Sequence, residues 1–213
     1  YVVVAIKWFS ILVIVSAGIM GVQELFGISV EQPEAANHLI QFFDISLAPI
    51  IEEIGFRVIL IGIPLFVLYS HGPSLKLLGK SLWWPWKNLQ NVSTKKALTI
   101  IVLVGILFGA AHIFSDESWS NGKLAQAVAS GIIIGWVYYR YGLAPALLVH
   151  WATNYFVYSY GYIVADINQI SIIDAFSHSL LSTIEIILIV TGIISVAVLA
   201  LNYVYTKKHE LET

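Results

Sequence analysis

The sequence has 213 residues, of which 58% are hydrophobic and only 11% are charged, and its mean hydropathy is +0.82. Soluble domains carry about 25% charged residues, so this composition excludes an ordinary soluble domain and a disordered chain and predicts an integral membrane protein. The formal net charge of −2 gives no reason to expect a nucleic-acid partner, and a chain without cysteine has no disulfide, thiol nucleophile or cysteine-ligated zinc. The sequence begins at Tyr1 rather than Met, so we expect that residues of the native N-terminus precede it.

Six apolar stretches follow one another, and a transmembrane helix needs about 20 apolar residues. The stretches lie at about 1–22, 40–69, 97–114, 123–140, 143–160 and 179–205. They predict an all-α fold, a polytopic transmembrane bundle of at least six spans in the lipid bilayer, with residues 1–213 forming a single domain. Pro49 and Pro64 fall in the second stretch, so we expect that helix to be kinked or broken, with the freed backbone groups bonded inside the protein.

The charged residues of the connectors separate by sign. Three connectors are acidic, with Lys123 as their one basic residue, whereas the remaining connectors and the tail are basic. The eight basic residues are Lys76, Lys80, Lys87, Lys95, Lys96, Arg140, Lys207 and Lys208. By the positive-inside rule, residues 70–96, Arg140 and the C-terminal tail are expected to lie in the cytoplasm.

Three polar groups interrupt the apolar stretches, and a charged residue inside a membrane costs about 2.5–3.5 kcal/mol on insertion scales. Such residues are therefore candidates for function. The groups are Glu52-Glu53-x-x-x-Arg57 in the second stretch, Phe108-x-x-x-His112 in the third and His150-x-x-x-Asn154 in the fifth.

Glu53 and Arg57 are four residues apart, so they share a helix face and can form an ion pair. Glu52 points about 100° away from Glu53 and needs a different partner. The alternative is a purely structural ion pair beside a protonated carboxyl group, and a pump or channel would also place carboxylates here.

The two histidines and Asn154 can supply that partner. Glu52 with a histidine forms an acid/base pair that can activate water, and a histidine with Asn154 can donate hydrogen bonds to an oxyanion. Glu52, His112 and His150 also match a zinc site with two histidines, one glutamate and an open fourth position. Single histidines in membrane helices more often serve as hydrogen-bonding groups between helices. Taken together, the residues predict hydrolysis within the membrane and leave the metal undecided.

These three motifs, in this order and on separate apolar helices, resemble those of the CPBP family. This family comprises CAAX proteases and bacteriocin-processing enzymes, is also called the Abi family, and includes the Ras-converting CAAX prenyl endopeptidases. The resemblance covers residues 45–160 and implies an intramembrane endopeptidase. It implies that Glu52 and His112 activate water, that His150 and Asn154 stabilise the oxyanion, and that Glu53 and Arg57 support them. For this family we favour a metal-free glutamate mechanism over zinc.

The short chain favours a prokaryotic member of the family, in the cell membrane, acting on a peptide precursor or a membrane-protein segment. Two alternatives are a non-enzymatic scaffold or bacteriocin-immunity protein of the same fold, and a proton-coupled transporter that uses the same Glu and His residues as a relay.

One geometric condition must hold if the two histidines belong to a single site. His112 is expected near the outer end of its helix and His150 about 10 Å from the inner end of its own, so tilt or an irregular helix must bring them level.

Overall fold

The computed structural model describes residues 1–30, 37–72, 74–114 and 121–212, and within these ranges the regular structure is helical, without strands. The predicted all-α class is therefore confirmed. In chain order the elements are α1 (Val2–Leu25), α2 (His38–Glu52), the π-helix η1 (Glu53–Gly62), α3 (Ile63–Tyr69), α4 (Leu75–Trp83), α5 (Pro85–Asn88), α6 (Thr94–Phe114), α7 (Lys123–Tyr141), α8 (Leu143–Thr153), the π-helix η2 (Asn154–Ser159), α9 (Tyr160–Asn168), α10 (Ile172–Phe176) and α11 (Ser179–Glu212).

Three helices of the described chain are long and apolar enough to cross a membrane. They are α1, α6 and residues Ser179–Tyr205 of α11, with hydropathies of 2.4, 2.5 and 2.7. They coincide with the first, third and sixth predicted stretches. The other three stretches are also helical, but they are interrupted or carry polar residues, and their crossing of the membrane stays a prediction.

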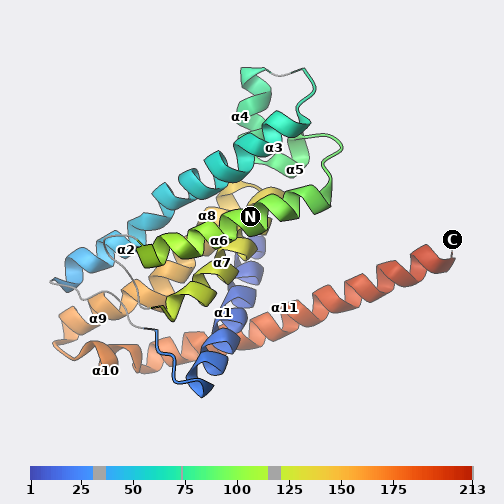
Figure 1. The fold of residues 1–213 in the computed structure, drawn as a ribbon. Helices are drawn as coiled ribbons and strands as arrows, with labels where there is room; N and C mark the ends of the chain where they lie inside the picture. The colour runs from blue at the N-terminus through green and yellow to red at the C-terminus, as the bar shows by residue number, and fades with distance from the viewer. Residues whose placement is uncertain (31–36, 73, 115–120, 213) are drawn as a thin grey trace.

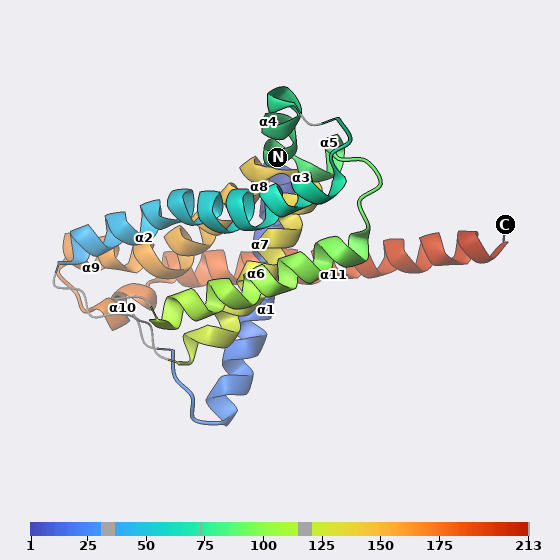
Figure 2. The same cartoon turned by 45° about the horizontal axis from the view of Figure 1, so that its top comes forward.

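The second predicted stretch forms α2, η1 and α3, which follow one another as one curved helix in Figures 1 and 2. The expected kink or break is thus a π-helical segment, in which the backbone bonds shift to i→i+5. The Glu-Glu motif lies at the change from α to π geometry, because α2 ends at Glu52 and η1 begins at Glu53. A second π-helix, η2, begins at Asn154 in the third motif. π-Helical turns frequently occur at functional sites.

Glycines allow α6 and α7 to pack closely, as their spacing predicts. A Cβ on Gly105 would lie 3.0 Å from the backbone nitrogen of Ile132, and one on Gly109 would lie 3.0 Å from that of Val128. Neither position therefore has room for a larger residue. This contact fixes the end of α6 that carries His112 beside α7.

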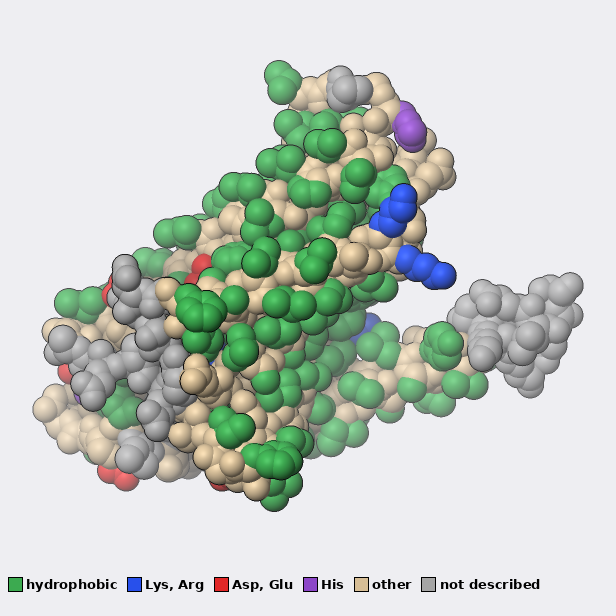
Figure 3. All heavy atoms as spheres, viewed as in Figure 1, with side chains coloured by type: hydrophobic (Ala, Val, Ile, Leu, Met, Phe, Trp, Pro, Cys, Tyr) green, Lys and Arg blue, Asp and Glu red, His purple; other side chains and the backbone are tan. Residues whose placement is uncertain are grey.

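On the face seen in Figure 3, exposed Lys and Arg side chains gather at one end, whereas Arg57 and Lys123 are buried inside the bundle. Figure 3 shows Lys and Arg side chains where α6 begins and Asp and Glu side chains at the opposite end, and in Figures 1 and 2 the C-terminal part of α11 extends past the bundle. At the basic end the Trp84 Nε1 donates to the carbonyl of Arg140 at 2.9 Å, and the Arg140 guanidinium lies 4.0 Å from the centre of the Trp86 ring. The charge separation read from the sequence therefore corresponds to two ends of the fold.

Candidate active site

Glu53 and Arg57 form the buried ion pair that their spacing predicts. Arg57 Nε lies 3.3 Å from Glu53 Oε2, and both side chains are 0% exposed. Burying both charges is tolerable only because they neutralise each other. This part of the site is closed to solvent and to substrate.

His150, in the third motif, contacts the two glutamates of the first motif. Its Nδ1 lies 2.7 Å from Glu53 Oε1 and its Nε2 lies 3.5 Å from Glu52 Oε2. Because a carboxylate oxygen only accepts, the short contact means that His150 Nδ1 donates to Glu53. One histidine on α8 thereby contacts both glutamates of α2 and η1.

The two neighbouring glutamates have different environments. The Glu52 side chain is 28% exposed, whereas that of Glu53 is 0% exposed. Only Glu52 therefore combines a nearby histidine with access from outside.

Phe108 lies at the centre of the three motifs, although its sequence position alone predicts no role for it. Its ring lies 4.6 Å from the Arg57 guanidinium, 4.6 Å from the His112 ring and 5.5 Å from the His150 ring. The ring faces a cation that is fully buried, where a cation–π contact is strongest. The signal was available in the Phe-x-x-x-His spacing, which places Phe108 one helical turn before His112.

His112 uses one ring nitrogen within its own helix. Its Nδ1 donates to the Phe108 carbonyl at 2.9 Å, because a carbonyl oxygen only accepts. In the neutral ring this leaves Nε2 as an acceptor. Such an acceptor can take a hydrogen bond from water or receive a proton.

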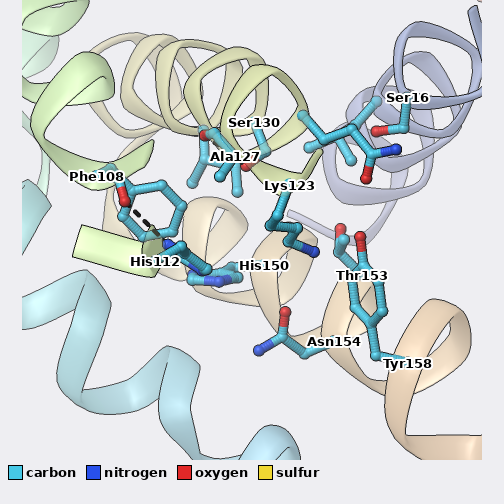
Figure 4. Close-up of a pocket in the computed structure, with 13 residues that line it drawn as sticks. Ser16, Phe108, His112, Lys123, Ala127, Ser130, His150, Thr153, Asn154 and Tyr158 are labelled. Atoms are coloured by element: carbon cyan, nitrogen blue, oxygen red, sulfur yellow. Dashed lines mark hydrogen bonds between the residues drawn. The ribbon is translucent and has the colours of Figure 1, made fainter. Parts of the chain in front are cut away.

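The structure brings the two histidines level, which the single-site interpretation requires. Both line one small cavity, and Figure 4 shows their rings side by side. Asn154 lies near them, one turn after His150 along the chain. The cavity has a volume of about 20 Å³, which suits about one water molecule. Glu52 is not part of its lining, and its carboxylate instead lies next to His150.

Lys123 also lies in this cavity, whereas its charge predicted a place in an outer connector. It is 5% exposed, and its ammonium lies 3.6 Å from the centre of the Tyr158 ring. Figure 4 shows its side chain extending among Thr153, Tyr158 and the histidines. The available signal was the spacing of Lys123, Gln126 and Ser130, which places three polar side chains on one face of α7.

Asn154 lines the cavity, and its side chain is hydrogen-bonded to a backbone carbonyl. Its Nδ2 donates to the carbonyl of Ile45 in α2 at 3.0 Å. A second bond joins the same two elements, between the buried hydroxyls of Ser46, the residue after Ile45, and Ser159 at the end of η2, 2.9 Å apart. Both ends of η2 are therefore bonded to α2.

A larger apolar cavity adjoins the polar one. Its volume is about 430 Å³, and it lies between α1, η2 and α11. Five residues line both cavities, namely Leu12, Ser16, Gln126, Thr153 and Tyr158. An apolar group in the larger cavity would therefore lie next to residues that also line the polar cavity. Glu185, near the start of α11, also lines this larger cavity.

The zinc site predicted from Glu52, His112 and His150 stays a prediction. Within the described residues no three His, Asp or Glu side chains are grouped as metal ligands. Nδ1 of each histidine is bonded, that of His112 to Phe108 and that of His150 to Glu53, and Nε2 is the ring nitrogen left to contact a metal or a water molecule. No chemical step is assigned to a metal here.

The comparisons with known proteins agree with the motifs. The chain matches the family model described as Type II CAAX prenyl endopeptidase Rce1-like over residues 35–156, a range that holds all three motifs and more than half of the chain. The comparisons with curated proteins and with solved structures gave no match. The chain belongs to the Rce1-like family of type II CAAX prenyl endopeptidases, as its motifs predicted, and this family supports a membrane protease of the CAAX type.

Proposed function

We propose that the chain is an intramembrane endopeptidase that hydrolyses a peptide bond with water activated by Glu52 and His112. One observation carries the proposal. Of two adjacent glutamates, Glu53 is sealed by Arg57 and His150, whereas Glu52 is 28% exposed and lies beside His150. A general base must be reachable by water and substrate, and only Glu52 meets that condition.

In the proposed reaction the water molecule is polarised by two acceptors, the Glu52 carboxylate and His112 Nε2. Glu52 takes a proton as the water oxygen attacks the carbonyl carbon of the scissile bond. The carbon–nitrogen bond then breaks, and the same proton passes to the leaving amine nitrogen. The products are a new carboxylic acid and a new amine, between which the second water proton passes to give carboxylate and ammonium, and Glu52 returns to its ionised form.

His150 is the proposed donor to the oxyanion. Because Nδ1 is bonded to Glu53, His150 donates to an oxyanion only when Nε2 also carries a hydrogen. Its Nε2–H then faces the reacting side while Nδ1 stays bonded to Glu53. A fixed donor of this kind stabilises the charge that develops on the carbonyl oxygen. The oxyanion role of Asn154 stays a prediction of the resemblance.

The substrate that we propose is a peptide precursor or a membrane-protein segment with an apolar part. The apolar cavity of about 430 Å³ shares five lining residues with the polar cavity and supplies room for such a part. The family points to prenylated CAAX peptides as the first probe.

The test uses purified chain in liposomes with an internally quenched peptide that carries a farnesylated CAAX end. We expect a fluorescence increase and, in H₂¹⁸O, one ¹⁸O atom in the new carboxylate of the product. The Glu52→Gln variant is the matched control and should leave the peptide intact. Failure of the native chain on this probe and on a library of unprenylated peptides would favour a non-enzymatic scaffold, and proton flux into dye-loaded liposomes would favour a transporter.

We also propose that the chain crosses a prokaryotic cell membrane six times, as one domain, with its basic end in the cytoplasm. The support is the gathering of Lys and Arg side chains at one end of the fold (Figure 3). Because the chain has no cysteine, a single Lys87→Cys change gives a unique label site. An impermeant maleimide should label it only after the cells are opened, and labelling of intact cells would contradict this topology.

A further inference from the structure

A proline inside α2 leaves one backbone carbonyl without its helical partner. In an α-helix the carbonyl of residue i accepts from the N–H of residue i+4. The partner of Ile45 would be the N–H of residue 49, but that residue is proline and has none. In a membrane interior an unsatisfied carbonyl costs several kcal/mol, so it must find another donor.

Asn154 is that donor. Its side-chain Nδ2 lies 3.0 Å from the Ile45 oxygen, although the two residues are 109 positions apart in the sequence. The bond comes from η2, which packs against α2. A side-chain amide thus replaces the one backbone bond that the proline removes.

The same motif holds the helix on the other side of the proline. One turn before Asn154, His150 contacts Glu52 and Glu53, which follow Pro49 by three and four residues. The two residues of the His-x-x-x-Asn motif therefore bind the helix on both sides of Pro49, Asn154 before it and His150 after it. A bend at Pro49 would move Glu52 relative to His150, and both contacts oppose such a bend.

We propose that Asn154 is a positioning residue, whose amide replaces the hydrogen bond lost at Pro49 and thereby fixes the Glu52 carboxylate against His150. This assignment differs from the oxyanion role that the resemblance implies. It rests on the proposed function for its activity measurement, but its stability measurement does not depend on that function.

The two roles can be separated by restoring the missing N–H. Pro49→Ala gives Ile45 a backbone donor, so Asn154 is no longer needed for this bond. We expect Asn154→Ala alone to lower Tm by about 2–12 °C, the effect of one unsatisfied buried carbonyl, and to reduce kcat at least about tenfold on the farnesylated peptide. In the Pro49→Ala background the same change should lower Tm by less than half as much and leave most of the cleavage intact.

Two controls make the rescue specific. Ser159→Ala removes the neighbouring bond between η2 and α2, which the 2.9 Å contact with Ser46 provides. Pro49→Ala should not rescue it, and equal rescue of both variants would show a general gain in helix stability and overturn the proposal. Pro64→Ala, which removes the other proline of this segment, should leave the Asn154→Ala defect unchanged.

The remaining outcomes each decide the question. If Asn154→Ala abolishes cleavage equally in both backgrounds, Asn154 acts on the reaction itself and the positioning role is wrong. If Pro49→Ala restores Tm but not cleavage, the amide satisfies the carbonyl without positioning Glu52, which also contradicts the proposal. If the native chain cleaves no peptide, the proposed function fails, and the coupling of the two changes in Tm still tests the bond to Ile45.

Discussion

The two sides of the polar centre differ in what their side chains are free to do. On the closed side, Glu53, Arg57 and Phe108 are almost fully buried and contact one another or His150. On the open side, Glu52 and His112 are only partly buried, and a small cavity adjoins the histidine. Adjacent residues of one motif can therefore serve different purposes, because one helix position faces the packed core and the next faces the space where a reaction can occur.

The largest expected effect is on the open side. His112→Ala removes the acceptor nitrogen and should lower the cleavage rate by about 10²–10⁴-fold, which is typical for loss of an acid/base group. Tm should change little, because the ring is partly exposed. His71→Ala in an exposed turn is the control and should retain full activity. Full activity of His112→Ala would remove this residue from the mechanism.

Substitutions on the closed side should mainly lower the free energy of unfolding. Arg57→Gln removes the cation beside the buried Glu53 carboxylate, which keeps only its bond from His150. Breaking a buried pair costs about 3–5 kcal/mol of unfolding free energy. The double change of Glu53→Gln with Arg57→Gln removes both charges and should recover part of this loss, because the amide oxygen introduced at position 53 can still accept from His150 Nδ1. Thermal and denaturant unfolding in detergent would measure the free energy of unfolding of both variants. A double variant less stable than Arg57→Gln would contradict the ion-pair account.

A smaller effect is expected at Phe108. Phe108→Leu removes the ring that faces the Arg57 guanidinium and should cost about 1–2 kcal/mol through the lost cation–π contact and the space left behind. Phe114 lies on the same helix and is 86% exposed, so Phe114→Leu should change stability by less than about 0.5 kcal/mol. Equal effects of the two changes would mean that the central position of Phe108 has no energetic consequence.

The sequence predicted the parts of the site that depend on local spacing. The Glu53–Arg57 pair follows from a four-residue separation, and the close packing of α6 on α7 follows from Gly105 and Gly109. The helical stretches follow from hydropathy. These features need no knowledge of which helices are neighbours.

Contacts between distant elements could not be predicted in this way. The bond from Asn154 to Ile45 depends on the path of η2 beside α2, and the π-helical geometry of both segments has no simple sequence signal. The charge of Lys123 predicts a place in a connector. The structure instead buries Lys123 against Tyr158, because α7 begins inside the bundle. The contacts of Phe108 with Arg57 and His150 could not be predicted either, because they depend on which helices are neighbours.

The central claim is that Glu52 performs the chemistry and Glu53 maintains the fold. The most direct measurement compares Glu52→Gln and Glu53→Gln for peptide cleavage and for Tm in the same detergent. We predict that Glu52→Gln loses about 10²–10⁴-fold in rate with an almost unchanged Tm. Glu53→Gln should instead lose about 3–5 kcal/mol of stability together with its activity, because Arg57 is left without its partner. Full cleavage by Glu52→Gln, or unfolding of Glu52→Gln beside a stable Glu53→Gln, would show that the two roles are reversed.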